Sequence, residues 1–502
     1  MYREAFINRL LYLLNLFATS VILLFFCYDF FLIILCWECI GLFSLLLVNF
    51  YSIRIYTIKA ALKTFIFSRI SDMFMFSAFI FTILIFNTTD LSLIFLQIPY
   101  LYFHIFFINK IAIHFLSLFA FLLSTSGVIK GAQFFFHVWL PDAMEAPTPA
   151  SALIHSSTLV IAGIFLILRF SVLFEFTILV NYYLALLGAI TLVFGSITAT
   201  FQSDIKKLVA YSTISQIGYL TCGCGYCCYE EVLIYLILHA LNKAFLFILV
   251  GYIVHFFNNN TDLRQMGGMY LYSFDICILL FGTCLNLAGL PYSAGFIGKE
   301  FLLFQLFNND SLSLFIRSCW AISFFFTPIY MFLLIFYVMF GPKKGTKNTY
   351  FSLFHINFQL TTSILINFLN KTFFIKNFNN KVNFFFQWTI LTSRITIYVL
   401  FSFWIFFFFC GEFLILLIYN FAAISDVIPS FYFFNIKSHF IFSLNLPSLF
   451  FTFSFNFILF FFILSSFLYL FTLLFKINYL YFNQWFILDF LFFLFFLFFL
   501  FF

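Results

Sequence analysis

Apolar runs of about 20 residues recur along the whole chain, separated by short polar segments. A run of this length crosses the hydrocarbon core of a bilayer as an α-helix. Continuous runs without strict alternation favour helices over the strands of a closed barrel, the other structure that satisfies every backbone polar group in lipid. Because 65% of the residues are hydrophobic and only 8% are charged, the sequence excludes a soluble domain. It predicts an all-α, polytopic membrane protein with no nucleic-acid partner.

Run lengths and flanking polar residues predict about thirteen transmembrane helices. Their expected ranges are 8–28, 29–50, 62–86, 110–138, 148–171, 177–200, 206–225, 230–256, 274–300, 312–340, 386–420, 446–475 and 482–502. Loops on the N-terminal side carry most of the lysines and arginines, so the positive-inside rule places the N-terminus on the matrix-like side of the membrane. The chain divides into a helix bundle at 1–341, a basic polar linker on the matrix side at 342–385 and Phe-rich membrane helices at 386–502.

The extreme phenylalanine content suggests where the chain is made. Phe contributes 93 of 502 residues, which indicates T-rich codons such as those of an AT-rich organelle genome. The first apolar run follows directly on Arg3, Glu4 and Arg9, without the cleavage site of a signal peptide or the amphipathic stretch of a transit peptide. We therefore expect an organelle-encoded protein that is made beside its membrane.

Four cysteines form a cluster at Cys222, Cys224, Cys227 and Cys228. The cluster has no histidine or second cysteine pair at the spacing that zinc and iron-sulfur sites use. Separate apolar thiols are therefore favoured, with a metal or disulfide set as the minor alternative. The sequence also has no Gly-rich nucleotide loop, iron-sulfur spacing or paired haem histidines, so we expect no redox centre, nucleotide or metal in this chain.

Ionisable residues lie inside the predicted membrane helices, on both sides of a polar, proline-rich segment at 139–151. Lys130 precedes this segment and His155 follows it. An ionisable group at the centre of a membrane helix costs roughly 2.5–3.5 kcal/mol on insertion scales, so such groups are usually paired or functional. The pattern indicates a pathway for charge through the membrane.

Two of the buried lysines lie next to helix-breaking residues. Lys130 has Gly127 and Gly131 on either side, and Lys299, followed by Glu300, comes after the run 290–298 with its proline and two glycines. Broken helices at mid-membrane expose carbonyl groups and helix ends that bind ions. For Lys299 the alternative is a lysine that extends from a helix end to the membrane surface.

Two further groups of ionisable residues precede Lys130. Glu38 has no basic residue within four positions, so its partner must come from another helix. Arg69 and Asp72 are three residues apart on one helix face and are expected to form an ion pair. A pair that only stabilises the fold deserves equal weight.

The histidines complete the pattern. His155 lies among serine and threonine hydroxyls that could hold water for proton transfer, although a satisfied core histidine is the alternative. His239 and Lys243 share one helix face with Tyr235 and are predicted to form a proton wire. A buried lysine whose charge is controlled by a nearby carboxylate can take up and release a proton, so proton transfer is the expected chemistry.

Seven strings resemble, in order, those of the chain 5 family of mitochondrial NADH:ubiquinone oxidoreductase (complex I). They are Trp37–Gly41, Ser68–Asp72, His137–Pro149, Ser203–Lys207, Tyr211–Gly218, His239–Ala244 and Asp262–Gly268. The resemblance covers residues 10–341 and implies a non-redox, proton-translocating subunit of the antiporter-like type at the far end of the membrane arm. FMN, iron-sulfur clusters and ubiquinone are then expected in partner subunits, whose quinone reduction drives proton transfer here.

The resemblance also implies roles for individual residues. Glu38 is the carboxylate paired with the central lysine, Lys130, and Lys299 beside Glu300 is the terminal lysine. The relay between them consists of His155, His239 and Lys243, and the pair Arg69 and Asp72 supports it. The expected surroundings are other membrane-arm subunits in the mitochondrial inner membrane and a lipid such as cardiolipin.

The chain departs from the family pattern in three places. The family has about three helices before the one that begins near residue 8, so either a separate small polypeptide supplies them or the arm is shortened. The family's relay helix carries a histidine where this chain has Tyr235, so proton passage there is expected to rely on water. Only 27 residues follow Phe475, so a full lateral helix is not expected.

Two alternatives share the same motifs. A subunit of a free-standing Mrp-type cation/proton antiporter would differ in its partners only, since motifs identify sites and not assemblies. A purely structural membrane subunit is less favoured, because the lysines at both predicted helix breaks, Lys130 and Lys299, are intact.

Overall fold

The computed structural model describes residues 6–341, with gaps at 103, 109–110, 157, 258, 272, 290–292 and 309–313. The predicted linker at 342–385 and the three helices expected between 386 and 502 lie outside the described residues. Within the described range the protein is a bundle of α-helices with one short hairpin, so the predicted all-α class is confirmed.

The first half of the bundle runs from α1 to α9. Its helices are α1 (Ile7–Phe26), α2 (Phe30–Val48), α3 (Ile55–Phe86), α4 (Leu91–Gln97), α5 (Phe115–Lys130), α6 (Trp139–Asp142), α7 (Thr148–Ser156), α8 (Leu159–Arg169) and α9 (Ser171–Glu175). The second half consists of α10 (Ile178–Thr200), α11 (Ile205–Gly225), α12 (Tyr229–Phe256), α13 (Phe274–Ala288), α14 (Ala294–Asn308) and α15 (Leu314–Ile335), which continues as a π-helical turn to Phe340. Seven helices of the described part are long and apolar enough to cross a membrane.

The helix predicted at 110–138 is wrong at both ends. The start of the predicted range forms the strand β2 (Ile111–His114), which pairs antiparallel with β1 (Ile105–Ile108), and α5 then spans only 115–130. Isoleucine and phenylalanine favour strands, and the two polar residues between the runs, Asn109 and Lys110, are the length of a tight hairpin connection. Because the segment was judged by its apolar content alone, a strand was predicted as part of a helix.

The helix predicted at 274–300 is two helices. α13 ends before Gly289, whose φ of 82° suits a glycine at a helix C-terminus. α14 begins at Ala294, after Pro291 in the sequence. The break expected before Lys299 is therefore present.

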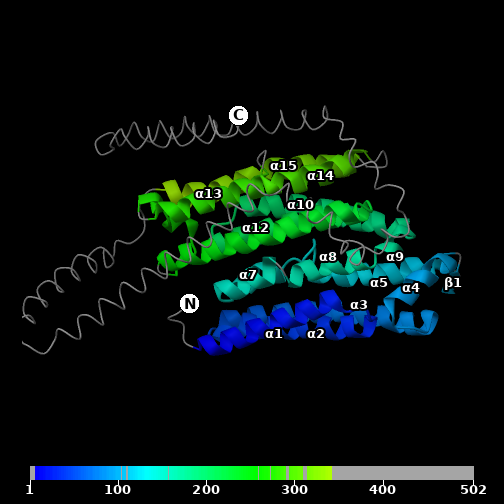
Figure 1. The fold of residues 1–502 in the computed structure, drawn as a ribbon. Helices are drawn as coiled ribbons and strands as arrows, with labels where there is room; N and C mark the ends of the chain where they lie inside the picture. Colours follow the sequence, from blue (N-terminus) through cyan, green and yellow to red (C-terminus); the bar gives the residue numbers. More distant parts are fainter. Residues whose placement is uncertain are drawn as a thin grey trace, which may run out of the picture. The chain divides into compact units, whose positions relative to one another are not determined.

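Many helices pack against one that is close to them in the sequence (Figure 1), but α15 also packs against α10, and α12 against α7. α2 contacts both α1 and α3, α3 contacts α5, and α5 contacts α8, while α10 packs along most of α11. Small residues permit the closest approaches. A methyl group added to Gly188 or Gly195 of α10 would meet the backbone of α11, and one added to Gly218 of α11 would meet α10.

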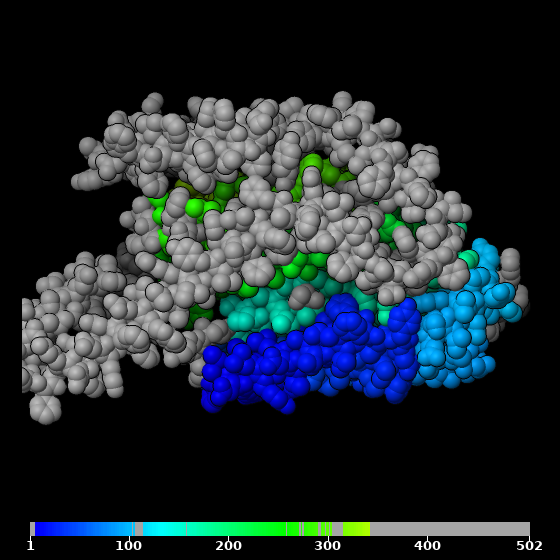
Figure 2. All heavy atoms as spheres, in the orientation of Figure 1, coloured from blue at the N-terminus to red at the C-terminus, as the bar shows by residue number. Residues whose placement is uncertain are grey.

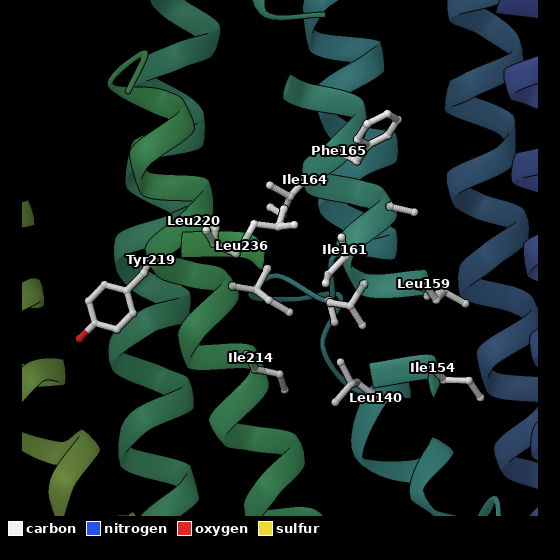
Figure 3. Packing of buried hydrophobic residues seen from close by; sticks show 14 of the residues in the cluster. Leu140, Ile154, Leu159, Ile161, Ile164, Phe165, Ile214, Tyr219, Leu220 and Leu236 are labelled. Carbon is white, nitrogen blue, oxygen red and sulfur yellow. The ribbon is translucent and has the colours of Figure 1, made fainter. Parts of the chain in front are cut away.

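The buried and exposed apolar side chains divide as expected for a membrane bundle. Figure 3 shows the packing between the α7–α8 region, α11 and α12, where Leu140, Ile161, Ile214 and Leu236 are buried. The surface of α1–α3, coloured dark blue in Figure 2, instead presents large apolar side chains, among them Leu11, Ile22, Leu42, Ile66, Met73 and Ile80. Lipid or another apolar surface is the medium that such a face suits.

Candidate functional site

The first helix break places Lys130 in the interior of the bundle. α5 ends at Lys130, and a non-helical stretch follows until α6 begins at Trp139. α5 packs closely against α8 at this point, because Gly127 of α5 contacts Gly163 of α8. A methyl group on Gly163 would overlap the Gly127 carbonyl oxygen. The Lys130 side chain is 1% exposed, so its charge depends on partners within the protein.

Those partners come from α2 and α3. The Lys130 ammonium donates to the Trp37 carbonyl oxygen at 2.7 Å and lies 4.0 Å from the centre of the Trp37 ring. Asp72, itself 3% exposed, has one carboxylate oxygen 3.4 Å from the Lys130 nitrogen and the other 3.5 Å from Arg69. The ion pair expected between Arg69 and Asp72 is thus the outer part of a three-membered chain that ends at Lys130.

The pairing of Glu38 with Lys130 is not the one that the structure shows. Among the described residues, Asp72 supplies the carboxylate within 4.0 Å of the Lys130 nitrogen. The carbonyl and ring of Trp37 occupy the side of α2 that faces Lys130. Glu38 is the next residue, about 100° further around the helix, and is partly exposed.

His155 lies between aromatic rings rather than hydroxyl groups. Its ring centre is 6.5 Å from that of Trp139 and 6.0 Å from that of Phe247, and the side chain is fully buried. The hydroxyls of Ser156 and Thr158 donate to carbonyl oxygens of their own segment. Neither nitrogen of His155 has a hydrogen-bond partner among the residues that the structure describes, so no described hydroxyl binds the imidazole directly.

The second group of buried cations belongs to α12 and its neighbours. Lys243, fully buried, donates to the Ser212 hydroxyl of α11 at 2.5 Å. His239 lies one turn earlier on α12, 1% exposed, and neither of its nitrogens has a partner in the described range. The expected stripe continues with Tyr235, whose ring centre is 6.4 Å from that of His239.

Lys299 lies across the second helix break. Its ammonium donates to the Leu287 carbonyl oxygen in the last turn of α13, at 2.5 Å. The negative end of a helix dipole favours a cation at this position. Lys299 and Glu300 are 3% and 4% exposed, so the alternative of a lysine reaching the membrane surface does not fit Lys299.

Two asparagines join this break to α12. Asn286 of α13 donates to Asn242, the residue before Lys243, at 2.6 Å. The same side chain accepts from the Gly295 amide at the start of α14 at 2.5 Å. Three helices are thereby held together within a few residues of Lys243 and Lys299.

Sequence reasoning missed the residues that act between helices. Two of them accept hydrogen bonds from the predicted lysines: Trp37 from Lys130 and Ser212 from Lys243. The other two, Asn242 and Asn286, connect the helices that carry Lys243 and Lys299. A usable signal existed only for the asparagines, which are rare in the apolar interior of a membrane helix. The partners of Lys130 and Lys243 are 93 and 31 residues away along the chain, so no local pattern marks them.

The side chains of the cysteine cluster do not converge on one point. Cys222, Cys224 and Cys228 are free thiols. The Cys222 sulfur accepts from the Trp320 ring nitrogen at 3.2 Å, and Cys227 accepts from Asn181 at 3.2 Å. Within the described part of the chain, no group of three histidine, cysteine, aspartate or glutamate side chains is placed to hold a metal ion.

The fold and site define a class of protein: a multi-pass membrane helix bundle with buried lysines at two helix breaks and buried histidines nearby. Buried ionisable side chains at broken membrane helices are typical of ion and proton pathways. Residues 27–326 match the family model described as NADH:quinone oxidoreductase/Mrp antiporter, TM. The chain belongs to this family.

Individual relatives agree with this assignment. The chain is similar to NADH-ubiquinone oxidoreductase chain 5 of Nyctotherus ovalis, 41% identical over 83% of this chain and 22% of the relative. It is 39% identical to the chain 5 of Paramecium tetraurelia over 69% of this chain and 60% of the relative. It is 38% identical to the chain 5 of Chondrus crispus over 62% of this chain and 48% of the relative. The chain thus spans less than two thirds of the length of each of these relatives.

A solved structure has a similar fold. It is described as the structure of the Mrp complex from Dietzia sp. DQ12-45-1b, with a TM-score of 0.57 and 28% sequence identity. The match covers 67% of this chain and 36% of that chain.

Proposed function

We propose that this chain is a proton-translocating membrane-arm subunit of a respiratory NADH:ubiquinone oxidoreductase. Quinone reduction in other subunits would drive proton transfer through its buried lysines, glutamates and histidines, and the chain itself would hold no redox centre. The names of the relatives support the complex, and the family supports ion movement.

The observation that carries the proposal is the way the buried lysines are bound. Lys130, the last residue of α5 before one helix break, donates to the Trp37 carbonyl within α2. Lys299 donates to the Leu287 carbonyl at the other break, and Lys243 donates to the Ser212 hydroxyl. A neutral lysine amine keeps part of these hydrogen bonds, so the change between the protonated and the neutral form costs only moderate free energy. Lys130 has Asp72 as its counter-ion as well, at 3.4 Å.

Asp72 and Glu38 have separate roles in this proposal. Asp72 stabilises the charged form of Lys130 in the arrangement seen here, and Arg69 holds Asp72 from the outer side. Glu38, one residue beyond the Trp37 carbonyl, is the second carboxylate near the same lysine. The proton released by Lys130 passes along His155, His239 and Lys243 to Lys299 and Glu300.

Asp72→Asn is expected to lower the rate of proton transfer at least tenfold, because it removes the charge that stabilises protonated Lys130 while keeping the size of the side chain. The measurement is proton uptake by vesicles containing the complex during NADH oxidation. Asp204→Asn is the matched control, since Asp204 also pairs with a lysine, Lys207, at 3.4 Å but at a partly exposed site. A normal rate in Asp72→Asn would assign Asp72 a structural role only.

The surroundings of the chain follow from the same proposal. We place it in the mitochondrial inner membrane, beside other membrane-arm subunits, as an organelle-encoded protein. Its exposed basic residues, such as Arg54 and Lys59, suit the phosphates of a lipid such as cardiolipin.

A free-standing Mrp-type cation/proton antiporter is the second candidate, favoured by the likeness to the solved Mrp complex. Native isolation of the complex, with NADH oxidation assayed in the gel and mass spectrometry of all companions, separates the two. Association with NADH oxidation and flavin or iron-sulfur proteins supports the first proposal. Association with other antiporter subunits alone supports the second.

A further inference from the structure

A hydrogen-bonded network joins α11, α12 and α15 beside the Lys243 site. The Tyr235 hydroxyl donates to the side-chain oxygen of Gln216, and the Gln216 amide donates to the Tyr330 hydroxyl at 3.2 Å. Tyr330 also lies 3.5 Å from the Ser215 hydroxyl. Gln216, Ser215 and Tyr330 are fully buried, and Tyr235 is 3% exposed.

The direction of each hydrogen bond follows from the protons available. The Ser215 hydroxyl donates to the Ser212 carbonyl at 2.9 Å, so in its contact with Tyr330 it must accept. The Ser212 hydroxyl donates to the Val209 carbonyl at 2.7 Å while it accepts from Lys243. Tyr235 has one proton, which the amide oxygen of Gln216 accepts.

Each chain of hydroxyl donors thus ends at an oxygen that cannot pass a proton on. Tyr330 donates to the Ser215 hydroxyl, whose own proton goes to the Ser212 carbonyl, and Tyr235 donates to the Gln216 amide oxygen. A proton relay needs groups that accept a proton on one side and donate one on the other. Here the donors end at main-chain carbonyls and at an amide oxygen. The network therefore holds side chains in place and does not conduct protons.

The position of Tyr235 agrees with a holding role. A methyl group added to Gly298 of α14 would lie 2.8 Å from the Tyr235 ring, so this ring packs directly against the residue before Lys299. On its other side Tyr235 is fixed by Gln216. Tyr235 thereby sets the spacing between α11, which carries the Ser212 acceptor of Lys243, and α14, which carries Lys299.

We infer that Gln216 and Tyr330 are positioning residues for the Lys243 site and that Tyr235 acts with them instead of carrying protons. The inference rests on the proposed function, and it leaves His239, with two nitrogens unbonded in the described range, as the carrier next to Lys243. It corrects the proton wire expected from Tyr235, His239 and Lys243, in which all three would conduct.

The test compares Tyr235→Phe, Tyr330→Phe and the double variant in the intact complex in vesicles. Each should lower the rate of proton transfer by on the order of fivefold, the effect of losing about one neutral hydrogen bond. The double variant should be no worse than either single one, because all three break the same network. The solvent hydrogen isotope effect should stay at the wild-type value.

Tyr219→Phe is the matched control. Tyr219 also joins α11 to α15, through the Ser323 hydroxyl at 2.6 Å, and Figure 3 shows its hydroxyl directed away from the labelled apolar side chains. Within the described part of the chain, Tyr219 forms no hydrogen bond with Gln216, Tyr235 or Tyr330, so Tyr219→Phe should leave the rate of proton transfer unchanged.

Two results would overturn the inference. One is a fall of tenfold or more in Tyr235→Phe, with an increased isotope effect and a normal rate in Tyr330→Phe, which would make Tyr235 a proton carrier. The other is a wild-type rate in both single variants.

An infrared measurement separates this inference from the proposed function. The C–O band of ring-labelled Tyr235, assigned from its loss in Tyr235→Phe, should shift in Tyr330→Phe and stay in place in Tyr219→Phe. This infrared measurement does not depend on proton transfer by the complex. If the band shifts but Lys243→Ala pumps normally, the network stands and the proposed proton pathway fails. An unmoved band in Tyr330→Phe contradicts the network itself.

Discussion

Gly163→Ala is expected to destabilise the chain by about 3 kcal/mol, at the upper end of the cost of overpacking, and to reduce its assembly in the membrane. The added methyl group would overlap the Gly127 carbonyl oxygen and lie 3.0 Å from the Gly131 amide nitrogen. Both are backbone atoms, so no side-chain rotation relieves the clash. α5 and α8 would have to separate, and α5 is the helix that ends at Lys130.

The measurement is the thermal stability of the solubilised complex, together with the amount of chain that it contains. Gly41→Ala is the matched control, because Gly41 is also a buried helix glycine, but a methyl group there would meet the Ser68 hydroxyl oxygen at an ordinary 3.4 Å. Alanine favours helices by up to about 1 kcal/mol over glycine, so Gly41→Ala should be neutral or slightly stabilising. Equal stability of the two variants would show that the close approach of α5 and α8 does not limit the fold.

Lys130→Ala is expected to abolish proton transfer through this chain and to leave the chain assembled. The lysine is the only described cation within 4.0 Å of Asp72 besides Arg69, so its removal takes away the proton carrier but leaves Asp72 with one partner. The remaining pair avoids the several kcal/mol that an isolated buried carboxylate would cost.

Assembly is measured by native gel and proton transfer by the acidification of vesicles. Lys207→Ala serves as the control, since its ammonium pairs with Asp204 in a partly exposed position. If Lys130→Ala disrupted assembly as severely as Gly163→Ala, Lys130 would be a structural residue. If it pumped normally, the proposed pathway would not pass through it.

The features that could be predicted from the sequence are those that arise within a single helix. Run lengths gave the main helices, and glycine and proline spacing gave the breaks at Lys130 and before Lys299. The pair Arg69 and Asp72 followed from i,i+3 spacing and is present at 3.5 Å. The error at 111–114 arose because isoleucine-rich segments suit strands and buried helices alike.

Contacts between helices could not be predicted in this way. Periodicity shows which residues share a face but not which neighbour that face meets, so nothing distinguished Asp72 from Glu38 as the partner of Lys130. Tyr330 bonds a residue 114 positions away, and its sequence surroundings are those of any apolar helix. The serine and threonine hydroxyls near His155 looked like a polar lining, yet they bond their own backbone.

The number of protons moved per NADH oxidised, in vesicles containing the wild-type complex or its Lys130→Ala, Lys243→Ala and Lys299→Ala variants, tests the central claim most directly. A single pathway through the three lysines predicts the same reduced value for all three variants and the wild-type value for Lys207→Ala. A wild-type value in any of the three buried-lysine variants would contradict the account.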